Sequence, residues 1–367
     1  MTKRERMLAT LHRERPDIIS WGGDLAYWIG GLGQDGKLDP RYGGDEGIFR
    51  LHRDLHVGFY LQGFFPFLTL YDGVDIRTET SGNLSTTRYV TPKGTLTEVW
   101  EYNAQTYSSG PREHLIKDID DLSILRYIYE HTHYEPDYER VGIFRDGIGD
   151  NGVVLCYTPR SPFMELVATK SGIENLTYII ADGEDEFDAT LEIMTAKHLA
   201  ASELTLKSGC ECVMVPENLS SEVVGKYYYE KYVRRYHNHI TDRIRDAGKF
   251  SFIHMDGTLA GLLCEISEAG FDVIEAMTPS PAGDLSIEDI ARITHPNTIV
   301  WGGIPGGYFH DIVSDEEFDA YVRHVLEVLC RRPNSALGVA DQIVPGSRPE
   351  RIKRVNELVE RYGAVLF

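Results

Sequence analysis

Short apolar runs recur along the chain, and each is bounded by glycine or by residues that favour turns. Eight of these runs predict strands, centred near residues 18, 58, 154, 213, 252, 273, 299 and 337. Strands that are buried on both faces read as nearly continuous apolar runs, which is typical of a parallel sheet covered by helices. The last six runs alternate with segments of helical character. The pattern therefore predicts an α/β fold, a (β/α)₈ TIM barrel.

Polar residues at the starts of segments predict where two of the helices begin. Residues 314–317 and 347–350 both read Ser-x-x-Glu. This is the spacing of a capping box, in which serine and glutamate satisfy free backbone N–H groups of the first turn. We expect the first box to open a helix that runs through Leu329, and the second to open the terminal helix. Another helical segment is predicted over residues 116–142.

The first third of the chain contains a segment of different texture. Polar and β-branched residues alternate on both sides of Pro92-Lys93-Gly94, which predicts a β-hairpin over residues 87–100. We interpret residues 66–145, roughly, as an insertion over one end of the barrel. The whole chain, residues 1–367, is then a single barrel domain, because this fold accommodates such insertions.

Charge and cysteine content narrow the possible functions. The chain has 57 acidic and 37 basic residues, which gives a formal net charge of -20. Nucleic acids and anionic membranes select a basic face, so neither is an expected partner. The five cysteines are an odd number and form no Cys-x-x-Cys pair. Residues 1–6 show no signal peptide and no apolar run could span a bilayer, so a cytoplasmic location is expected.

Polar side chains gather at the predicted ends of strands, where barrel enzymes place their active sites. His254 ends one strand and is followed by Asp256, Glu275 ends the next strand, and Glu217 follows an earlier one. One imidazole together with carboxylates is a donor set that suits zinc. We therefore predict a metal site formed by Glu217, His254, Asp256 and Glu275. Acids at such turns also cap helices, which is the structural alternative for each of them.

Other candidates follow from the same strand-end rule. Asp341 comes directly after the last strand, and we assign it a catalytic role together with the histidine. Aromatic residues near the ends suit a flat organic substrate, so Tyr157, Trp301 and Tyr308 are predicted to bind substrate. Packing within loops is the alternative for any one of them. His237 lies in a polar helical segment and is expected to face solvent.

Several stretches carry a resemblance that extends over most of the chain, namely residues 91–96, 117–122, 254–257, 272–279, 283–286 and 300–305. On these stretches the chain resembles the uroporphyrinogen decarboxylase superfamily, and within it the corrinoid-dependent methyltransferases of the O-demethylase type. The resemblance implies a (β/α)₈ barrel. It also implies a zinc cofactor, and a cobalamin that is supplied by a separate corrinoid carrier protein.

Two departures from the family patterns refine the expected reaction. Residues 18–25, where the decarboxylases carry arginines that hold a tetrapyrrole, contain no arginine. Relatives that act on coenzyme M have His-x-Cys-Gly and a late cysteine, where this chain has Asp256 and Asp341. Carboxylates still bind zinc but make a less thiophilic site. Related members with such a pattern take a methyl group from O-methyl compounds, including methoxylated aromatics.

These observations lead to one hypothesis and two alternatives. The chain is expected to transfer a methyl group from a small O-methylated donor to the cobalt of a corrinoid carrier protein, with metal assistance and with His254 and Asp341 as catalytic residues. The first alternative is a metal-free decarboxylase or lyase of the same superfamily, with His254 as general acid and a glutamate as base. The second is a barrel that only binds a small molecule or a corrinoid partner. A homodimer is a possible assembly.

Overall fold

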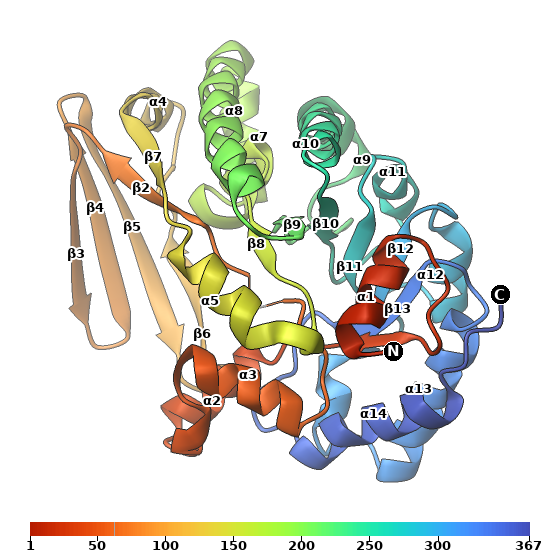
Figure 1. Cartoon of the computed structure of the whole chain (residues 1–367). Helices are drawn as coiled ribbons and strands as arrows, with labels where there is room; N and C mark the ends of the chain where they lie inside the picture. The colour runs from red at the N-terminus through yellow and green to blue at the C-terminus, as the bar shows by residue number, and fades with distance from the viewer. Residues whose placement is uncertain (62) are drawn as a thin grey trace.

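The central sheet explains how distant parts of the sequence meet. The computed structural model describes residues 1–61 and 63–367, and in these residues seven parallel strands form one sheet in the order β1-β13-β12-β11-β10-β9-β8 (Figure 1). The strands are β1 Ser20–Gly22, β8 Leu155–Tyr157, β9 Cys212–Val215, β10 Phe250–His254, β11 Val273–Met277, β12 Ile299–Pro305 and β13 Ser335–Ala340. The curled parallel sheet confirms the predicted barrel architecture.

The two ends of this sheet are joined by the segment that was predicted to be the second strand. Gly58 forms a parallel bridge with Gly22 in β1, and Phe59 forms one with Gly152, just before β8. The Gly58 N–H donates to the carbonyl of Trp21 at 3.2 Å, and the Val153 N–H donates to the carbonyl of Phe59 at 2.9 Å. The segment meets each neighbour at only one residue, so it makes isolated bridges where a regular strand was expected.

Helices surround the sheet. They are α1 Lys3–Leu11, α2 Ala26–Gln34, α3 Gly44–Asp54, α5 Glu139–Ile148, α6 Pro162–Glu165, α7 Ile173–Asp182, α8 Glu184–Lys207, α9 Lys226–Tyr228, α10 Arg234–Asp246, α11 Leu263–Ser267, α12 Ile287–Ile293, α13 Asp315–Leu329 and α14 Pro349–Tyr362. Short 3₁₀ or π turns are η1 Pro40–Tyr42, η2 Gly149–Asn151, η3 Leu166–Lys170, η4 Tyr229–Val233 and η5 Gly306–Phe309. No helix in the described part of the chain is both long enough and apolar enough to cross a membrane.

The two capping-box predictions have different outcomes. Ser314 caps α13, and both hydrogen bonds of the box with Glu317 are present. The prediction of a capping box at residues 347–350 is wrong. The helix α14 begins at Pro349, its N-cap is Arg348, and no side chain makes a capping hydrogen bond. Proline at the first helical position needs no N–H partner and is pre-shaped for the helix, so α14 can begin there without a serine cap.

Residues 67–136 form two small β-sheets and one helix beside the barrel. A four-stranded antiparallel sheet contains β3 Asp75–Ser81, β4 Leu84–Thr91, β5 Gly94–Asn103 and β6 Ser108–Glu113, and it stands at the left of the barrel in Figure 1. The predicted hairpin is present as β4 and β5, which pair through Thr91 and Gly94. A two-stranded ribbon joins β2 Phe67–Tyr71 to β7 Thr132–Pro136, and α4 Asp121–Glu130 lies between these segments in sequence.

The strand β7 corrects the helix predicted over residues 116–142. Only residues 121–130 and the start of α5 are helical, and Thr132–Pro136 pairs antiparallel with β2. Within this strand Thr132 is buried and the remaining residues are half-buried or exposed, so most of β7 lies at the surface. Pairing with a distant strand therefore overrides the local helical pattern.

Two apolar clusters lie on the two faces of the barrel sheet. The inner cluster takes alternate residues of the strands, including Met214, Phe252 and Val273, together with Met7 and Leu11 of α1. The intervening residues belong to the outer cluster, which includes the apolar faces of the helices. Successive side chains of a strand point to opposite faces. Each strand residue is therefore assigned by its position to the interior of the barrel or to the helical layer.

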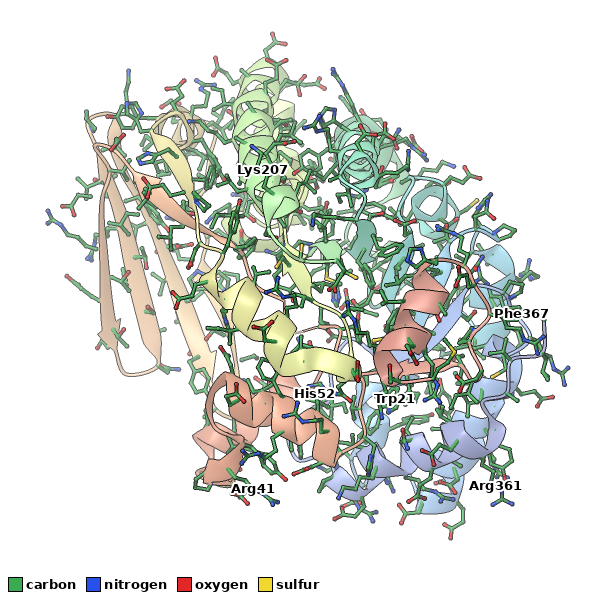
Figure 2. All side chains as sticks on the ribbon, in the orientation of Figure 1. Trp21, Arg41, His52, Lys207, Arg361 and Phe367 are labelled. Atoms are coloured by element: carbon green, nitrogen blue, oxygen red, sulfur yellow. The ribbon has the colours of Figure 1, made fainter. Side chains whose placement is uncertain are left out.

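The helix α3 buries a histidine in the outer cluster. His52, labelled in Figure 2, is fully buried, and its ring packs against Phe59 with 4.6 Å between ring centroids. Neither ring nitrogen has a hydrogen-bond partner among the described residues. Burial lowers the pKa of His52 to about 3, because the charged imidazolium cannot be solvated there.

This buried imidazole predicts a loss of stability in mild acid. The unfolded chain takes up a proton at this position below about pH 6.5, but the folded protein does so only near its pKa of about 3. Stability is therefore lost as the pH falls below 6.5. We expect this group to remove about 2 kcal/mol of unfolding free energy between pH 7 and pH 5. Urea titrations measure the unfolding free energy at pH 7 and at pH 5. The native protein should lose about 2 kcal/mol more between these pH values than His52→Leu does. An equal loss in the two proteins would contradict the prediction.

Candidate active site

The site is built from neighbouring strands whose ends face the barrel interior. His254 ends β10 and pairs in register with Glu275 of β11. Glu275 was expected to end its strand, but it lies in the middle of β11, which continues to Met277. His254 lies two residues after Phe252, and Glu275 lies two residues after Val273, both of which belong to the inner cluster. Strand alternation therefore turns the imidazole and the carboxylate inward, as the strand-end rule predicts.

A buried carboxylate fixes the orientation of the imidazole. Glu275 Oε2 lies 2.7 Å from His254 Nδ1, and the Tyr60 hydroxyl donates to Glu275 Oε1 at 2.8 Å. Glu275 and Tyr60 are fully buried. Because the carboxylate accepts at Nδ1, that nitrogen carries the proton, and Nε2 is the atom directed to the open side of the site.

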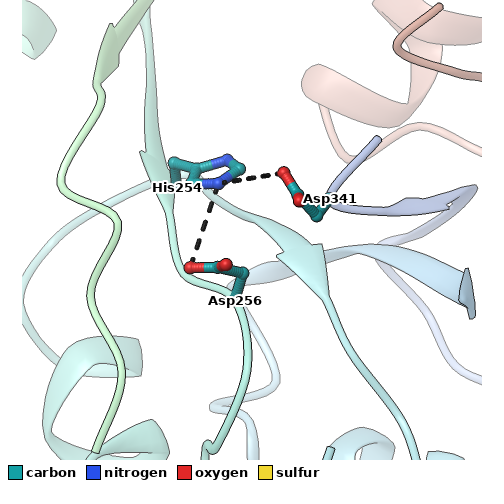
Figure 3. A group of neighbouring side chains, drawn as sticks. All are labelled: His254, Asp256 and Asp341. Atoms are coloured by element: carbon teal, nitrogen blue, oxygen red, sulfur yellow. Dashed lines mark ion pairs between the residues drawn. The ribbon is translucent and has the colours of Figure 1, made fainter. Parts of the chain in front are cut away.

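Two further acids face Nε2 (Figure 3). Asp256 Oδ1 lies 4.0 Å from His254 Nε2, and Asp341 Oδ1 lies 3.6 Å from it. These separations are too long for hydrogen bonds. One ligand atom from each of the three residues lies within 4.8 Å of the others. The Asp341 side chain is 52% exposed, so the group opens to solvent on that side.

The backbone at Asp341 brings this acid to the site. Alternation along β13 places Leu337 and Val339 in the outer cluster, so a continued strand would turn Asp341 outward as well. Its φ of +65° instead lies in the left-handed region, which aspartate tolerates better than most residues. The strand ends there, and the carboxylate comes to face His254.

The electrostatics of the site show strong coupling between its charges. Burial alone would lower the pKa of His254, but the charge and hydrogen bond of Glu275, together with Asp256 and Asp341, raise it to about 9. Partial desolvation at the rim of the barrel, together with repulsion from Asp256 and Glu275, raises the pKa of Asp341 to about 6, against the lowering effect of the histidine. Without a metal, this histidine is protonated at neutral pH, and it neutralises part of the acidic group.

A fourth acid, Asp24, belongs to the same electrostatic unit. It follows β1 and is buried, and its Oδ1 accepts the Ala26 N–H at 2.7 Å. Burial, with added repulsion from Glu275 and Asp341, raises the pKa of Asp24 to about 7. Its position directly after the first strand already places Asp24 on the rim by the strand-end rule, although it was not among the predicted metal-binding or catalytic residues.

The donor set fits a divalent metal such as zinc. Zinc bonds of about 2.0–2.2 Å to nitrogen and oxygen in a tetrahedron place neighbouring ligand atoms roughly 3.4 Å apart. The distances of 3.6 and 4.0 Å from His254 Nε2 to the two aspartates are close to that spacing. Glu275 holds the other ring nitrogen, which is the outer hydrogen bond that metal-binding histidines usually make. His254, Asp256 and Asp341 could therefore act as ligands, with Glu275 behind them.

Glu217 does not lie in this group, which differs from the prediction. In β9 the inner positions are Cys212 and Met214, and Val215 belongs to the outer cluster. Glu217 is two residues further on and turns outward in the same way. Its carboxylate accepts the Ser161 N–H at 3.1 and 3.2 Å and lies 2.7 Å from His237 Nε2. Its hydrogen bonds are thus made within the helical layer.

The partner of Glu217 corrects a second expectation. His237 is completely buried, although a solvent-facing position was predicted. Its place on α10 gives the reason, because His237, Ile240 and Ile244 are buried at a spacing of three, four and seven residues. This is the spacing of one helix face. The two isoleucines were a signal in the sequence that this face of the helix points to the core.

The three predicted substrate-binding aromatics lie in different surroundings. Tyr157 ends β8 in register with Met214, so it shares the inner face with His254. Trp301 is fully buried and packs on Tyr60 with 4.4 Å between ring centroids. It lies mid-strand, because β12 continues to Pro305, and this position differs from the predicted rim. Tyr308, in η5, is half-buried and packs edge-on against Tyr321 of α13 at 4.5 Å.

The fold and the strand-end group define a (β/α)₈-barrel protein with a candidate metal centre at the carboxyl ends of its strands. The family described as Uroporphyrinogen decarboxylase (URO-D) matches residues 106–362, which is well over half of the chain. The chain therefore belongs to the uroporphyrinogen decarboxylase family, as the resemblance implied at the level of the superfamily. A comparison with curated proteins finds no match.

One solved structure supports the fold over the whole length of the chain. A methyltransferase from Methanosarcina mazei superposes with a TM-score of 0.63 at 11% sequence identity, and the match covers 99% of each chain. A ribulose-1,5-bisphosphate carboxylase/oxygenase from Pyrococcus horikoshii OT3 gives a TM-score of 0.31 at 12% identity, covering 66% of this chain and 48% of that one. The first likeness extends the barrel assignment beyond the residues that the family matches.

Proposed function

We propose that this protein is a metal-assisted methyltransferase, which takes a methyl group from a small O-methylated donor and passes it to the cobalt of a corrinoid carrier protein. The observation that carries the proposal is the group of His254, Asp256 and Asp341, whose ligand atoms lie within 4.8 Å of one another at the mouth of the barrel. Two carboxylates and one imidazole form a hard donor set, which favours an oxygen-linked donor over a thiol. Family membership and the methyltransferase with the same fold are consistent with this class.

The residues of the chain have separate tasks in the proposed reaction. Three protein ligands leave a position for the donor oxygen, and a zinc ion held there would act as a Lewis acid on that oxygen. Glu275 and Tyr60 hold the imidazole so that Nε2 stays aimed at the opening. Asp24, with its pKa of about 7, can hold a proton near the oxygen that leaves as a phenolate. Tyr157 forms part of the inner wall next to this space.

The direct test is loss of the donor methyl group in the presence of a corrinoid acceptor. Full-length protein supplied with zinc is mixed with 2-methoxyphenol or other methoxyarenes and with chemically reduced cobalamin. The demethylated phenol and the absorbance change of cobalamin should appear together. No phenol should form without cobalamin, and the cobalamin spectrum should not change without the methoxyarene. Asp341→Asn should slow this turnover by at least about tenfold, because losing a direct ligand should cost no less than losing an outer hydrogen-bond partner of a ligand.

A matched control separates the metal site from general damage. Asn tolerates the left-handed backbone of Asp341 as aspartate does, so Asp341→Asn should fold normally. The control is Asp311→Asn, which changes a more exposed carboxylate that pairs with Arg348 and does not belong to the strand-end group. This variant should keep native turnover. Protein that carries zinc but demethylates none of the methoxyarenes would overturn the proposal.

A second candidate is the metal-free acid–base reaction of a decarboxylase or lyase. The raised pKa values of His254, about 9, and of Asp24, about 7, favour it, because one group is then a proton donor and the other can accept or donate near neutrality. Release of carbon dioxide from an aromatic acid by chelator-treated protein would support this candidate. Such activity would be unaffected by cobalamin.

A further inference from the structure

A second concave site lies where the inserted segment meets the barrel. This cavity of about 290 Å³ is bounded by β2, β7 and α4 on one side and by residues 159–170 and α8 on the other. Its charged lining residues are Arg160, Glu165 and Lys170. None of its lining residues belongs to the group around His254, so the cavity is separate from the candidate metal centre.

Buried hydrogen bonds fix the backbone that carries the first of these charges. The carbonyl of Arg160 lies 2.9 Å from Nδ1 of His198, which is buried on α8. The next residue, Ser161, donates its N–H to the buried carboxylate of Glu217. Arg160 is therefore held on both sides by groups in the helical layer. This is the role that the structure gives to Glu217, and it makes the cavity wall a rigid feature.

Within residues 1–61 and 63–367, the two cationic side chains of the cavity have no hydrogen-bond acceptor. Arg160 Nη1 and Lys170 Nζ lie 3.9 and 3.7 Å from the Glu165 oxygens, which is beyond hydrogen-bond distance. Arg160 Nε is buried without a hydrogen-bond partner among the described residues. The two cationic side chains are only 22% and 20% exposed. Burying donors without acceptors is unfavourable, so this arrangement is suited to an acceptor that comes from outside the chain.

The charge balance of the cavity favours a single negative charge. Burial would raise the pKa of Glu165, but Lys170, His198, Arg160 and a hydrogen bond from Thr169 lower it, so the carboxylate is ionised. Burial lowers the pKa of His198, which is therefore neutral at pH 7. Two cations and one carboxylate leave one positive charge. An arginine fork binds a carboxylate with two parallel hydrogen bonds, and lysine adds a point charge.

Aromatic residues make up much of the remaining lining, next to aliphatic side chains such as Leu125 and Ile128 of α4. Phe67 of β2 and Tyr134 of β7 pack edge to face with 5.4 Å between ring centroids, and Phe65 packs on Phe67 at 5.5 Å. Tyr71 and Tyr129 also line the cavity. Aromatic walls favour flat rings through edge and face contacts. A cavity of about 150 Å³ is known to hold benzene, so this one has room for a single ring with its substituents.

We propose that this cavity binds a monocyclic aromatic carboxylate. The carboxylate group supplies the acceptor that Arg160 and Lys170 lack, and the ring lies against Phe67, Tyr71 and Tyr134. The proposal does not rest on methyl transfer at His254, because no residue is shared between the two sites. It assigns the inserted segment a binding role, since β2 and β7 provide one wall of the cavity.

Isothermal titration of the full-length protein with benzoate tests the proposal. We expect saturable binding, at least about tenfold weaker binding of benzamide, and at least about tenfold weaker benzoate binding by Arg160→Gln and by Lys170→Gln, as the loss of a charge-assisted hydrogen bond predicts. Lys207→Gln is the matched control, because Lys207 is exposed at the end of α8 (Figure 2) and does not line the cavity. It should bind benzoate as the native protein does.

Two further variants keep the outcome decisive if a charge replacement disturbs folding. Thr69→Trp narrows the cavity from its exposed β2 edge and removes no charge, and it should also weaken benzoate binding. Asp341→Asn alters only the other site and should leave binding unchanged. Equal affinity for benzoate and benzamide, equally strong competition by inorganic phosphate, or loss of binding in Asp341→Asn with retention in Thr69→Trp would each overturn the proposal. Failure of methyl transfer would leave these measurements unaffected.

Discussion

Protein purified after growth with zinc should carry about one equivalent of the metal, and His254→Ala should carry almost none. His254 is the single nitrogen donor of the group, and its Nε2 lies between the two aspartates. Removing it leaves two carboxylates, one of which is half exposed, and such a pair holds zinc weakly. Mass spectrometry for metals on dialysed protein gives the stoichiometry directly.

Comparison of the two glutamates distinguishes the ligand set of the structure from the set predicted by the sequence. Glu275→Gln should weaken zinc binding by about 10–100-fold, because it removes the charge behind the imidazole and leaves the three ligands in place. Glu217→Gln should keep native zinc content, since Glu217 bonds to Ser161 and His237. Loss of zinc in Glu217→Gln, with retention in Asp341→Asn, would show that the predicted ligand set was the better one.

Removal of the Glu217 carboxylate should instead destabilise the fold. Glu217 and His237 are both 0% exposed and 2.7 Å apart, and the same carboxylate accepts the Ser161 N–H. Glu217→Ala leaves a buried imidazole and a buried N–H without acceptors. Breaking a buried pair in this way costs about 3–5 kcal/mol. Urea denaturation at pH 7 measures the loss of unfolding free energy, and the Tm of the variant should fall as well.

An exposed ion pair provides the control for this effect. Glu327 in the last turn of α13 pairs with Arg331, which lies just beyond the end of this helix, and the two side chains are 63% and 64% exposed. Glu327→Ala should change the unfolding free energy by less than about 1 kcal/mol, because solvent screens such pairs. A loss in Glu217→Ala as small as that in Glu327→Ala would contradict the structural role of Glu217. The double variant Glu217→Ala with His237→Ala would then measure how strongly the two side chains are coupled.

Much of the fold follows from local patterns in the sequence. The apolar runs near residues 154, 213, 252, 273, 299 and 337 became strands of the barrel, because burial on both faces requires apolar residues throughout. The hairpin at Pro92-Lys93-Gly94 and the capping box at Ser314 were equally readable. Where long-range pairing competed with a local preference, the prediction was wrong. Residues 132–136 pair with β2 although their neighbours on both sides are helical.

The spacing of the apolar runs by itself placed His254 and Asp256 at the end of one strand and Glu275 on the next strand along the chain, because strand length and strand period depend on local residue types. Tertiary structure alone decided what each acid does there. Glu217 continues the outward alternation of β9, and its side chain contacts His237. Asp341 directly follows β13 with a φ of +65°, and this backbone turn directs its side chain to the opening of the barrel. Beyond the last ladder hydrogen bond, the direction of a side chain depends on backbone turns and on distant partners. Neither of these is encoded in the spacing of residues along the chain.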